Sequence, residues 1–266
     1  MPSPEQRRLI DEIARRLDTE PDVEALWLAG SLGKGQGDAF SDVDLLVLTA
    51  DGAAADVSAR LARDLVPALS VVLVNSLYGG RVLNMVTADW DRFDLTLVQR
   101  EDLPRYDASA LTPIFNKGDS TPPAKPQAPY RTSPAELSKL VSEFLRVIGL
   151  TPVAMGREEY QLALNGVDLL RRMNMDLMLE ENGVSPAARG GALHRNHLLT
   201  AEQRDALQAL PTVAAERSSI LAGNAAFAAL FLPRAKRLAD EIGMDWPSAF
   251  EDATRRHLQR TLQLNL

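Results

Sequence analysis

Hydrophobic residues follow two different patterns along the chain, and the change of pattern divides it into two parts. From Glu24 to Gln99, short apolar runs of strand length alternate with turn residues, as in EALWLAG, DVDLLVLT, LSVVLVNSLY, RVLNMVT and RFDLTLVQ. Gly79 and Gly80 separate two of these runs and favour a hairpin, while residues 51–68 have the apolar spacing of a helix. This part is therefore predicted to be a small α/β domain with a mixed sheet.

The second pattern begins near residue 134, where apolar residues recur every three or four positions. Segments such as SPAELSKLVSEFLRVIGL and GREEYQLALNGVDLLRRMNMDLMLEENG have the spacing of amphipathic helices. Two helix starts are marked by capping-box spacing, Ser133 with Glu136 and Thr200 with Gln203. The second part is therefore predicted to be an all-α helical bundle.

The stretch PIFNKGDSTPPAKPQAPYRTSP, from Pro113 to Pro134, is rich in proline and has no sustained apolar period. Such a composition is typical of a stiff, extended connection between domains. We accordingly expect a catalytic domain over residues 1–115, a linker over 116–133 and a bundle over 134–266.

Composition and charge exclude several functions. The 266 residues include no cysteine, which removes disulfides, thiolate catalysis and cysteine-based zinc sites. The formal net charge of −7 gives no general attraction for nucleic acid, so we expect no nucleic-acid partner.

The segment before Pro21 has the pattern of an amphipathic helix and lacks the apolar core of a signal peptide. The apolar run from Ile220 to Leu232 is too short to cross a bilayer, so we expect a cytoplasmic protein with no membrane partner.

Two aspartates at the start of a predicted strand are the first candidates for chemistry. Asp42 and Asp44 are two residues apart, so both side chains project from the same face of the strand. A solvated strand end is the common explanation for such acids. Their repulsion, however, would be relieved by a hard cation such as Mg²⁺, which prefers oxygen ligands. The preceding predicted strand ends at Gly30 and Ser31, where backbone amides can approach a phosphate closely.

A third acid, Asp94, lies on a later alternating strand and can join the first two if the strands are neighbours. Three carboxylates can hold two divalent ions, position the phosphates of a nucleotide and activate an attacking hydroxyl. This favours a metal site over solvated acids. Lys34 in the glycine-rich turn either neutralises a triphosphate or is simply solvated.

These residues carry a resemblance to a known family. Gly30 and Ser31, a gap of ten residues, and then Asp42, Val43 and Asp44 resemble the GS-x10-D-x-D pattern of the DNA polymerase beta nucleotidyltransferase superfamily. More narrowly, GSLGKGQGDAFSDVDLLV followed by GREEYQLALNGVDLLRR is similar to the lincosamide nucleotidyltransferases, the antibiotic adenylyltransferases in which a catalytic domain precedes a helical bundle.

The resemblance implies transfer of AMP from Mg²⁺-ATP to a hydroxyl of an antibiotic, a lincosamide, bound by the helical domain. It places Gly30 and Ser31 on the triphosphate, and Asp42 and Asp44 on the metal, with two Mg²⁺ ions expected. Asp94 is then a third ligand or the general base.

Related adenylyltransferases sometimes recruit a glutamate of the helical domain as base, so Glu158 and Glu159, at a predicted helix start, remain alternatives. Tyr160 beside them either packs in the bundle or stacks on the acceptor. A homodimer would also fit the resemblance.

The sequence is also compatible with three other functions. Polycationic aminoglycosides are alternative acceptors because ammonium groups attract carboxylates in an acidic protein. A protein-adenylylating enzyme of the antitoxin type is another alternative, although those enzymes are usually small single domains. A non-catalytic nucleotide-binding module is a third, and the presence of all three acids argues against it.

Overall fold

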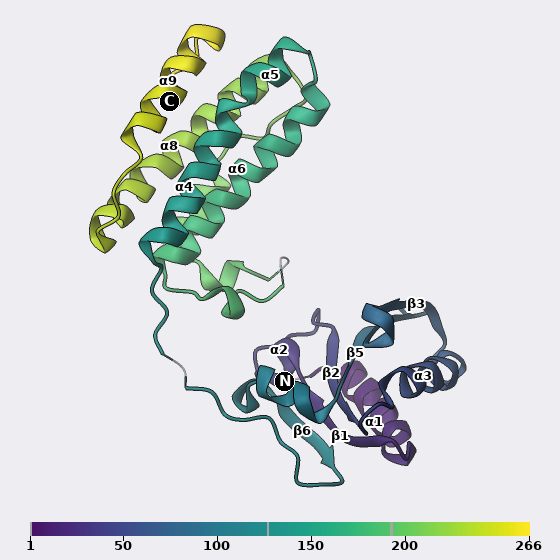
Figure 1. Ribbon diagram of the computed structural model, residues 1–266. Helices are drawn as coiled ribbons and strands as arrows, with labels where there is room; N and C mark the ends of the chain where they lie inside the picture. The colour runs from purple at the N-terminus through teal and green to yellow at the C-terminus, as the bar shows by residue number, and fades with distance from the viewer. Residues whose placement is uncertain (1, 127, 192–193) are drawn as a thin grey trace. The chain divides into compact units, whose positions relative to one another are not determined.

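The computed structural model describes residues 2–126, 128–191 and 194–266, and it divides into two compact units, Met1–Gln127 and Ala128–Leu266 (Figure 1). Each unit has its own hydrophobic core. The first contains a mixed sheet with helices and the second is helical. The predicted order of an α/β domain and a helical bundle is therefore confirmed.

The first unit is built on a six-stranded sheet with the strand order β3-β4-β5-β2-β1-β6. The strands are β1 Val23–Leu28, β2 Val43–Thr49, β3 Val71–Leu77, β4 Val82–Thr87, β5 Arg92–Val98 and β6 Thr112–Asn116. Among the described residues β2 and β5 pair in parallel, and the other neighbouring strands pair antiparallel. The hairpin predicted at Gly79 and Gly80 is present between β3 and β4, and both glycines have positive φ.

Two helices, α1 Pro4–Thr19 and α3 Ala54–Ala68, pack on one face of this sheet. Ser3 caps α1 in a capping box with Gln6, and the helix buries one apolar stripe that includes Ile13 and Leu17. These side chains share a core with inward-facing residues of the central strands, such as Leu45 of β2. The alternation of the strands therefore leaves Asp42, Asp44 and Asp94 on the other face.

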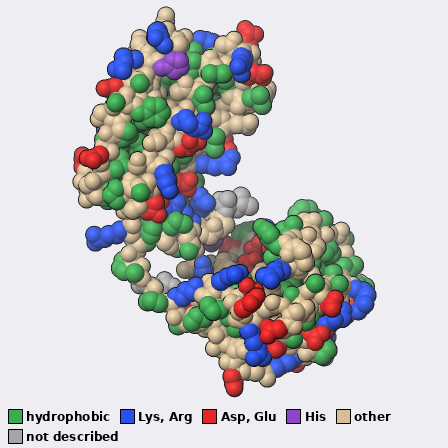
Figure 2. Space-filling view, viewed as in Figure 1, with side chains coloured by type: hydrophobic (Ala, Val, Ile, Leu, Met, Phe, Trp, Pro, Cys, Tyr) green, Lys and Arg blue, Asp and Glu red, His purple; other side chains and the backbone are tan. Residues whose placement is uncertain are grey.

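That other face is covered over only part of its width. There the chain forms two short 3₁₀ helices, η2 Arg100–Arg105 and η3 Ala108–Ala110. Leu103 of η2 packs over Trp27 of β1 and Leu46 of β2, together with Tyr106 and Leu111. Toward β3, Leu73 and Leu77 are nearly half exposed. Figure 2 shows hydrophobic side chains at the surface of the first unit, in the region where Figure 1 places β3.

The proline-rich stretch departs from the sequence-based prediction at its beginning. We predicted an extended connection from Pro113 onward, whereas Thr112–Asn116 forms the edge strand β6 and pairs with β1. Proline cannot donate to a ladder, but an edge strand has one side that needs no partner, so Pro113 is tolerated there. The composition alone hid this strand because it is short and contains a proline.

The second unit is a bundle of helices with a main apolar core and a smaller apolar cluster around Met178, Leu179 and Leu199. Its α-helices are α4 Pro134–Gly149, α5 Thr151–Gly156, α6 Tyr160–Glu181, α7 Ala201–Gln208, α8 Arg217–Ile242 and α9 Ser248–Leu262. Phe144 of α4 stacks on Phe231 of α8 with ring centroids 3.9 Å apart. The predicted capping boxes at the starts of α4 and α7 are both present.

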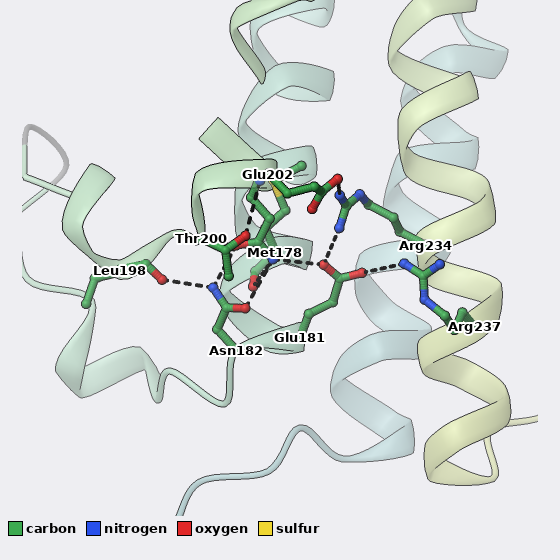
Figure 3. A network of polar contacts seen from close by, with 9 residues as sticks. Met178, Glu181, Asn182, Leu198, Thr200, Glu202, Arg234 and Arg237 are labelled. Carbon is green, nitrogen blue, oxygen red and sulfur yellow. Dashed lines mark hydrogen bonds and ion pairs between the residues drawn. The ribbon is translucent and has the colours of Figure 1, made fainter. Parts of the chain in front are cut away.

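A polar network joins three of these helices at one end of the bundle (Figure 3). Arg234 of α8 contacts Glu181 of α6 at 2.8 Å and also forms an ion pair with Glu202 of α7. Arg237 makes a longer contact of 3.4 Å with the same Glu181 carboxylate. The largely buried pair of Arg234 and Glu181 joins α8 to α6, and the contact of Arg234 with Glu202 joins α7 to both.

None of the helices in the described parts of the chain combines the length and the apolar character needed to cross a bilayer.

Candidate active site

Two of the predicted carboxylates are brought together by the parallel pairing of β2 with β5. Asp44 and Asp94 are direct partners in this ladder, so their side chains project side by side from the same face. Asp42 comes directly before β2 and lies on the same side by alternation. The sequence-based expectation that the strand of Asp94 neighbours that of Asp42 and Asp44 therefore matches the sheet order.

The electrostatics of these carboxylates reflect partial burial and mutual repulsion. Burial raises the pKa of Asp44 to about 6; the negative charges of Asp42 and Asp94 add to this rise, and Arg92 opposes it. The pKa of Asp94 is also raised, mainly by burial, while a hydrogen bond from Asn84 lowers it. A group of acids that repel one another in this way is a favourable place for a cation, because positive charge removes the repulsion.

Gly30 begins the four-residue helix α2 Gly30–Gly33, where the sequence predicted a glycine-rich turn. Its φ is +58°, and a Cβ placed there would lie 1.8 Å from Oδ2 of Asp44. A glycine is therefore required both by the backbone conformation and by the carboxylate that packs against it. The N–H of the preceding Ala29 donates to the carbonyl of Asp44 at 2.8 Å, which holds the end of β1 beside the start of β2.

The loop that leads into Asp42 is held by two side chains that the sequence did not single out. Gln6 of α1 is buried and donates from Nε2 to the carbonyls of Asp38 at 2.9 Å and Ser41 at 2.7 Å. Arg92 of β5 donates from Nη2 to the carbonyl of Phe40 at 2.9 Å. The spacing of Ser3 and Gln6 is a capping-box signal, but nothing in the sequence connects Gln6 to this loop.

Asn84 is a further residue that sequence reasoning missed. It is the partner of Asp94 in the antiparallel ladder between β4 and β5, and its side chain hydrogen-bonds to the Asp94 carboxylate. Asn75 of β3 is in turn the partner of Asn84. A row of polar side chains thus crosses four strands on the open face and ends at Asp44. The order of the strands in the sheet brings these residues into one row, and no local sequence motif predicts it.

The other predicted site residues fall in two places. Ser31 follows Gly30 in α2 and is half-buried, and Lys34 is exposed at the end of the same short helix. Glu159 is the N-cap residue of α6 in the second unit, and Glu158 precedes it with a φ of +58°. Both glutamates are exposed, whereas Tyr160 packs against the core of the bundle.

The donor set around Asp44 fits a hard divalent cation in chemical type, since all the candidate ligands are carboxylate oxygens. Among the described residues, however, no group of three or more His, Asp or Glu side chains is arranged to hold a metal ion. The charge and the ligand type that a divalent cation needs are therefore present in Asp42, Asp44 and Asp94. For all three carboxylates to bind one ion, their side chains would have to change rotamer.

Residues 8–75 match a family model described as "Nucleotidyltransferase domain". The matched range contains Gly30 and Ser31 of α2, and Asp42 and Asp44 at the start of β2. This segment is similar to a nucleotidyltransferase domain. Asp94 lies beyond the matched range, and the sheet of the first unit brings it beside Asp44. The prediction of a nucleotidyltransferase enzyme is thereby confirmed. The family match does not identify the molecule that accepts the nucleotide.

The solved structures to which the chain is similar are distant in sequence. An aminoglycoside 6-adenyltransferase from Bacillus subtilis is 14% identical, over 93% of this chain and 95% of that one, with a TM-score of 0.44. A nucleotidyltransferase-like protein from Exiguobacterium sibiricum is 16% identical, over 97% and 87% of the two chains, with a TM-score of 0.35. A tRNA nucleotidyltransferase in complex with a primer tRNA and an incoming ATP analogue is 14% identical, over 90% and 65%, with a TM-score of 0.32. No curated protein sequence matches the chain significantly.

Proposed function

We propose that the protein transfers AMP from ATP to a hydroxyl of a small antibiotic, with Mg²⁺ as the metal. The observation that carries the proposal is the pairing of Asp44 with Asp94 on adjacent parallel strands, beside Gly30, where Gly30 and Asp44 lie in the segment that matches the nucleotidyltransferase family model. Carboxylates grouped on an open sheet face next to a glycine-lined backbone suit the binding of a metal-bound triphosphate.

Each residue has a role in this proposal. Gly30 and Ser31 offer N–H groups at the start of α2, which have no earlier helical carbonyl to donate to and can bind phosphate oxygens. Asp42 and Asp44 would hold Mg²⁺, with two ions if Asp94 joins them. When bound, the metal supplies positive charge that offsets the charge of the triphosphate and the leaving pyrophosphate. Lys34 is close enough in sequence to contribute further charge.

Asp94 has two possible roles, as a third metal ligand or as the base that accepts the proton of the attacking hydroxyl. Its raised pKa suits a group that exchanges a proton, and the Asn84 hydrogen bond holds the carboxylate in place. Asp94→Asn separates the roles. A base is indicated if turnover falls while Mg²⁺-dependent ATP affinity survives, and a metal ligand if that affinity falls as well.

For the acceptor we propose a lincosamide, bound by the helical unit that follows the catalytic unit. Glu158, Glu159 and Tyr160 are our candidates for contact with it, because the two glutamates are exposed beside a tyrosine ring at the start of α6. Exposed carboxylates would also attract the ammonium groups of an aminoglycoside, so that class is the second candidate acceptor.

The test is a mass-spectrometric assay of the purified protein with Mg²⁺-ATP and a panel of lincosamides, streptomycin-type and kanamycin-type aminoglycosides. We expect one drug class to gain the mass of AMP. Asp44→Asn should reduce this transfer at least about a hundredfold, whereas Asp89→Asn, an exposed acid in the turn before β5, should leave it unchanged. Transfer that survives Asp44→Asn would contradict the assignment of the site.

A further inference from the structure

The edge strand β3 combines exposure, apolar side chains and an absence of charge. It ends the sheet on one side, and among the described residues its ladder partner is β4. Val72 is 68% exposed, Leu73 47%, Leu77 43% and the adjoining Tyr78 80%. No charged residue occurs in residues 65–80. Edge strands of monomeric proteins usually carry charges, prolines or covering segments that prevent pairing with another chain.

The opposite edge of the same sheet has that kind of protection. β6 has five residues, contains Pro113 and is followed directly by Lys117. A proline removes a ladder donor and a lysine opposes close approach of a second strand. The two edges therefore differ in charge and proline content: β3 has neither, and among the described residues its one irregularity is the register shift between Val71 and Leu73, before the segment from Leu73 to Leu77.

The sequence of β3 is also complementary to itself. If two copies pair antiparallel with the two-fold axis at Asn75, then Leu73 lies opposite the partner's Leu77 and Leu77 opposite the partner's Leu73. The two asparagines then face each other at the axis, where an amide can both donate and accept a hydrogen bond. All three side chains are on the open face of the sheet, because Asn75 is the ladder partner of Asn84.

We infer that β3 is the surface through which a second copy of this chain binds, by antiparallel pairing centred on Asn75. The contact is isologous, so one short segment completes it without any other element. Its lack of charge matters because the whole chain carries −7, and two copies repel each other least along a neutral strand. The two sheets then join into one continuous sheet.

The size of this contact sets the expected strength of the dimer. One pair of seven-residue strands buries less surface than the roughly 1,200 Å² typical of stable, specific interfaces. The backbone hydrogen bonds of the edge and the two leucine pairs must therefore supply most of the affinity. We expect a dimer that dissociates on dilution, with a dissociation constant on the order of micromolar.

The absence of cysteine allows a direct test by single introduced cysteines in the full chain. Under mild oxidation Asn75→Cys should form a disulfide-linked dimer, because the two positions meet at the axis. Leu73→Cys alone should cross-link at least about tenfold more slowly, and so should Leu77→Cys. A mixture of Leu73→Cys and Leu77→Cys chains should cross-link efficiently. These four samples define the register.

Sedimentation velocity on the protein without cysteine supplies the second measurement. The wild-type chain should shift from monomer toward dimer between about 1 and about 100 μM. Leu73→Lys, at an exposed position, should weaken the association at least about tenfold, and far-ultraviolet circular dichroism would show that the fold is kept. A wild-type chain that stays monomeric over this range would overturn the proposal. Equal cross-linking rates at positions 73 and 75 would also overturn it.

Discussion

Gly30 and Asp44 occupy adjoining positions so closely that a single added methyl group cannot be accommodated. Gly30→Ala would place a Cβ 1.8 Å from Oδ2 of Asp44 and would also force a left-handed conformation on alanine. We expect loss of about 2 to 4 kcal/mol of unfolding free energy and a large loss of AMP transfer, because the carboxylate must move. Urea unfolding and the drug-modification assay measure the two effects.

Gly35 provides the matched control for this substitution. Its φ is +69°, yet a Cβ there would meet nothing within 4 Å. Gly35→Ala therefore carries the left-handed strain without the collision and should cost only about 1 kcal/mol. If the two alanine variants lost equal stability and equal activity, the packing of Asp44 on Gly30 would not be the cause.

The raised pKa of Asp44 predicts how stability changes with pH in the metal-free protein. Folding raises this pKa to about 6, so the folded state favours the protonated carboxyl. The contribution of the Asp44 carboxyl group to the free energy of unfolding is complete below the unfolded pKa near 4. It is lost as the pH rises through about 6. It amounts to at most about 3 kcal/mol.

Chemical unfolding at pH values from about 4 to about 8, in the presence of a chelator, tests this dependence. Asp44→Asn cannot ionise at this position, so it should be more stable than the wild type at the upper end of the range. A parallel pH dependence for the two proteins would contradict the assignment of the shift to Asp44.

Asn84 is expected to act as a positioning residue for Asp94, through the hydrogen bond between their side chains. Asn84→Leu removes the donor while keeping a similar volume, and should lower kcat at least about tenfold with a smaller change in the KM for ATP. Asn84→Ser keeps a hydroxyl donor and should recover part of the loss. Equal kcat values for the serine and leucine variants would exclude a positioning role.

At the level of elements, the sequence predicted regular segments well where a pattern was strong. The alternation in DVDLLVLT and RFDLTLVQ identified β2 and β5, and the Gly79-Gly80 pair identified the hairpin. It failed at β6, where Pro113 and the short length concealed a strand, and at Gly30–Gly33, which forms a helix rather than a turn.

The site was predicted only as far as its residues shared a local motif. Asp42 and Asp44 could be paired from their spacing, and Asp94 from the assumption that two strands are neighbours. The roles of Gln6, Arg92 and Asn84 depend on contacts set by strand order and helix packing, so no spacing rule reveals them.

The polar network at the end of the bundle gives a prediction about helix packing. Arg234→Met should destabilise the second unit by about 2 to 4 kcal/mol, because it leaves the largely buried Glu181 without its nearest cation. Arg237→Met is the control: its side chain is 60% exposed and contacts Glu181 at 3.4 Å, so it should cost under about 1 kcal/mol. Thermal unfolding of both variants, followed by helical ellipticity, compares them. Equal losses would show that burial of the pair is not decisive.

For the whole molecule, the two separate cores predict two units that fold independently. A fragment of residues 128–266 should keep its helical circular dichroism and unfold cooperatively. A fragment of residues 1–127 should bind Mg²⁺-ATP but transfer no AMP, since the proposed acceptor contacts lie in the other fragment. Failure of either fragment to unfold cooperatively would show that the cores depend on each other.

The parallel pairing of β2 with β5 also has a consequence for the order of events during folding. The hairpin of β3 and β4 closes over a few residues and can form early. By contrast, β2 and β5 meet only after the chain from Thr49 to Arg92 has looped back, which is an entropically costly closure between distant segments. The carboxylates of Asp44 and Asp94 therefore encounter each other late, when most of the core is already in place. Conditions that weaken their repulsion, such as mild acidity, should accelerate that final step of refolding.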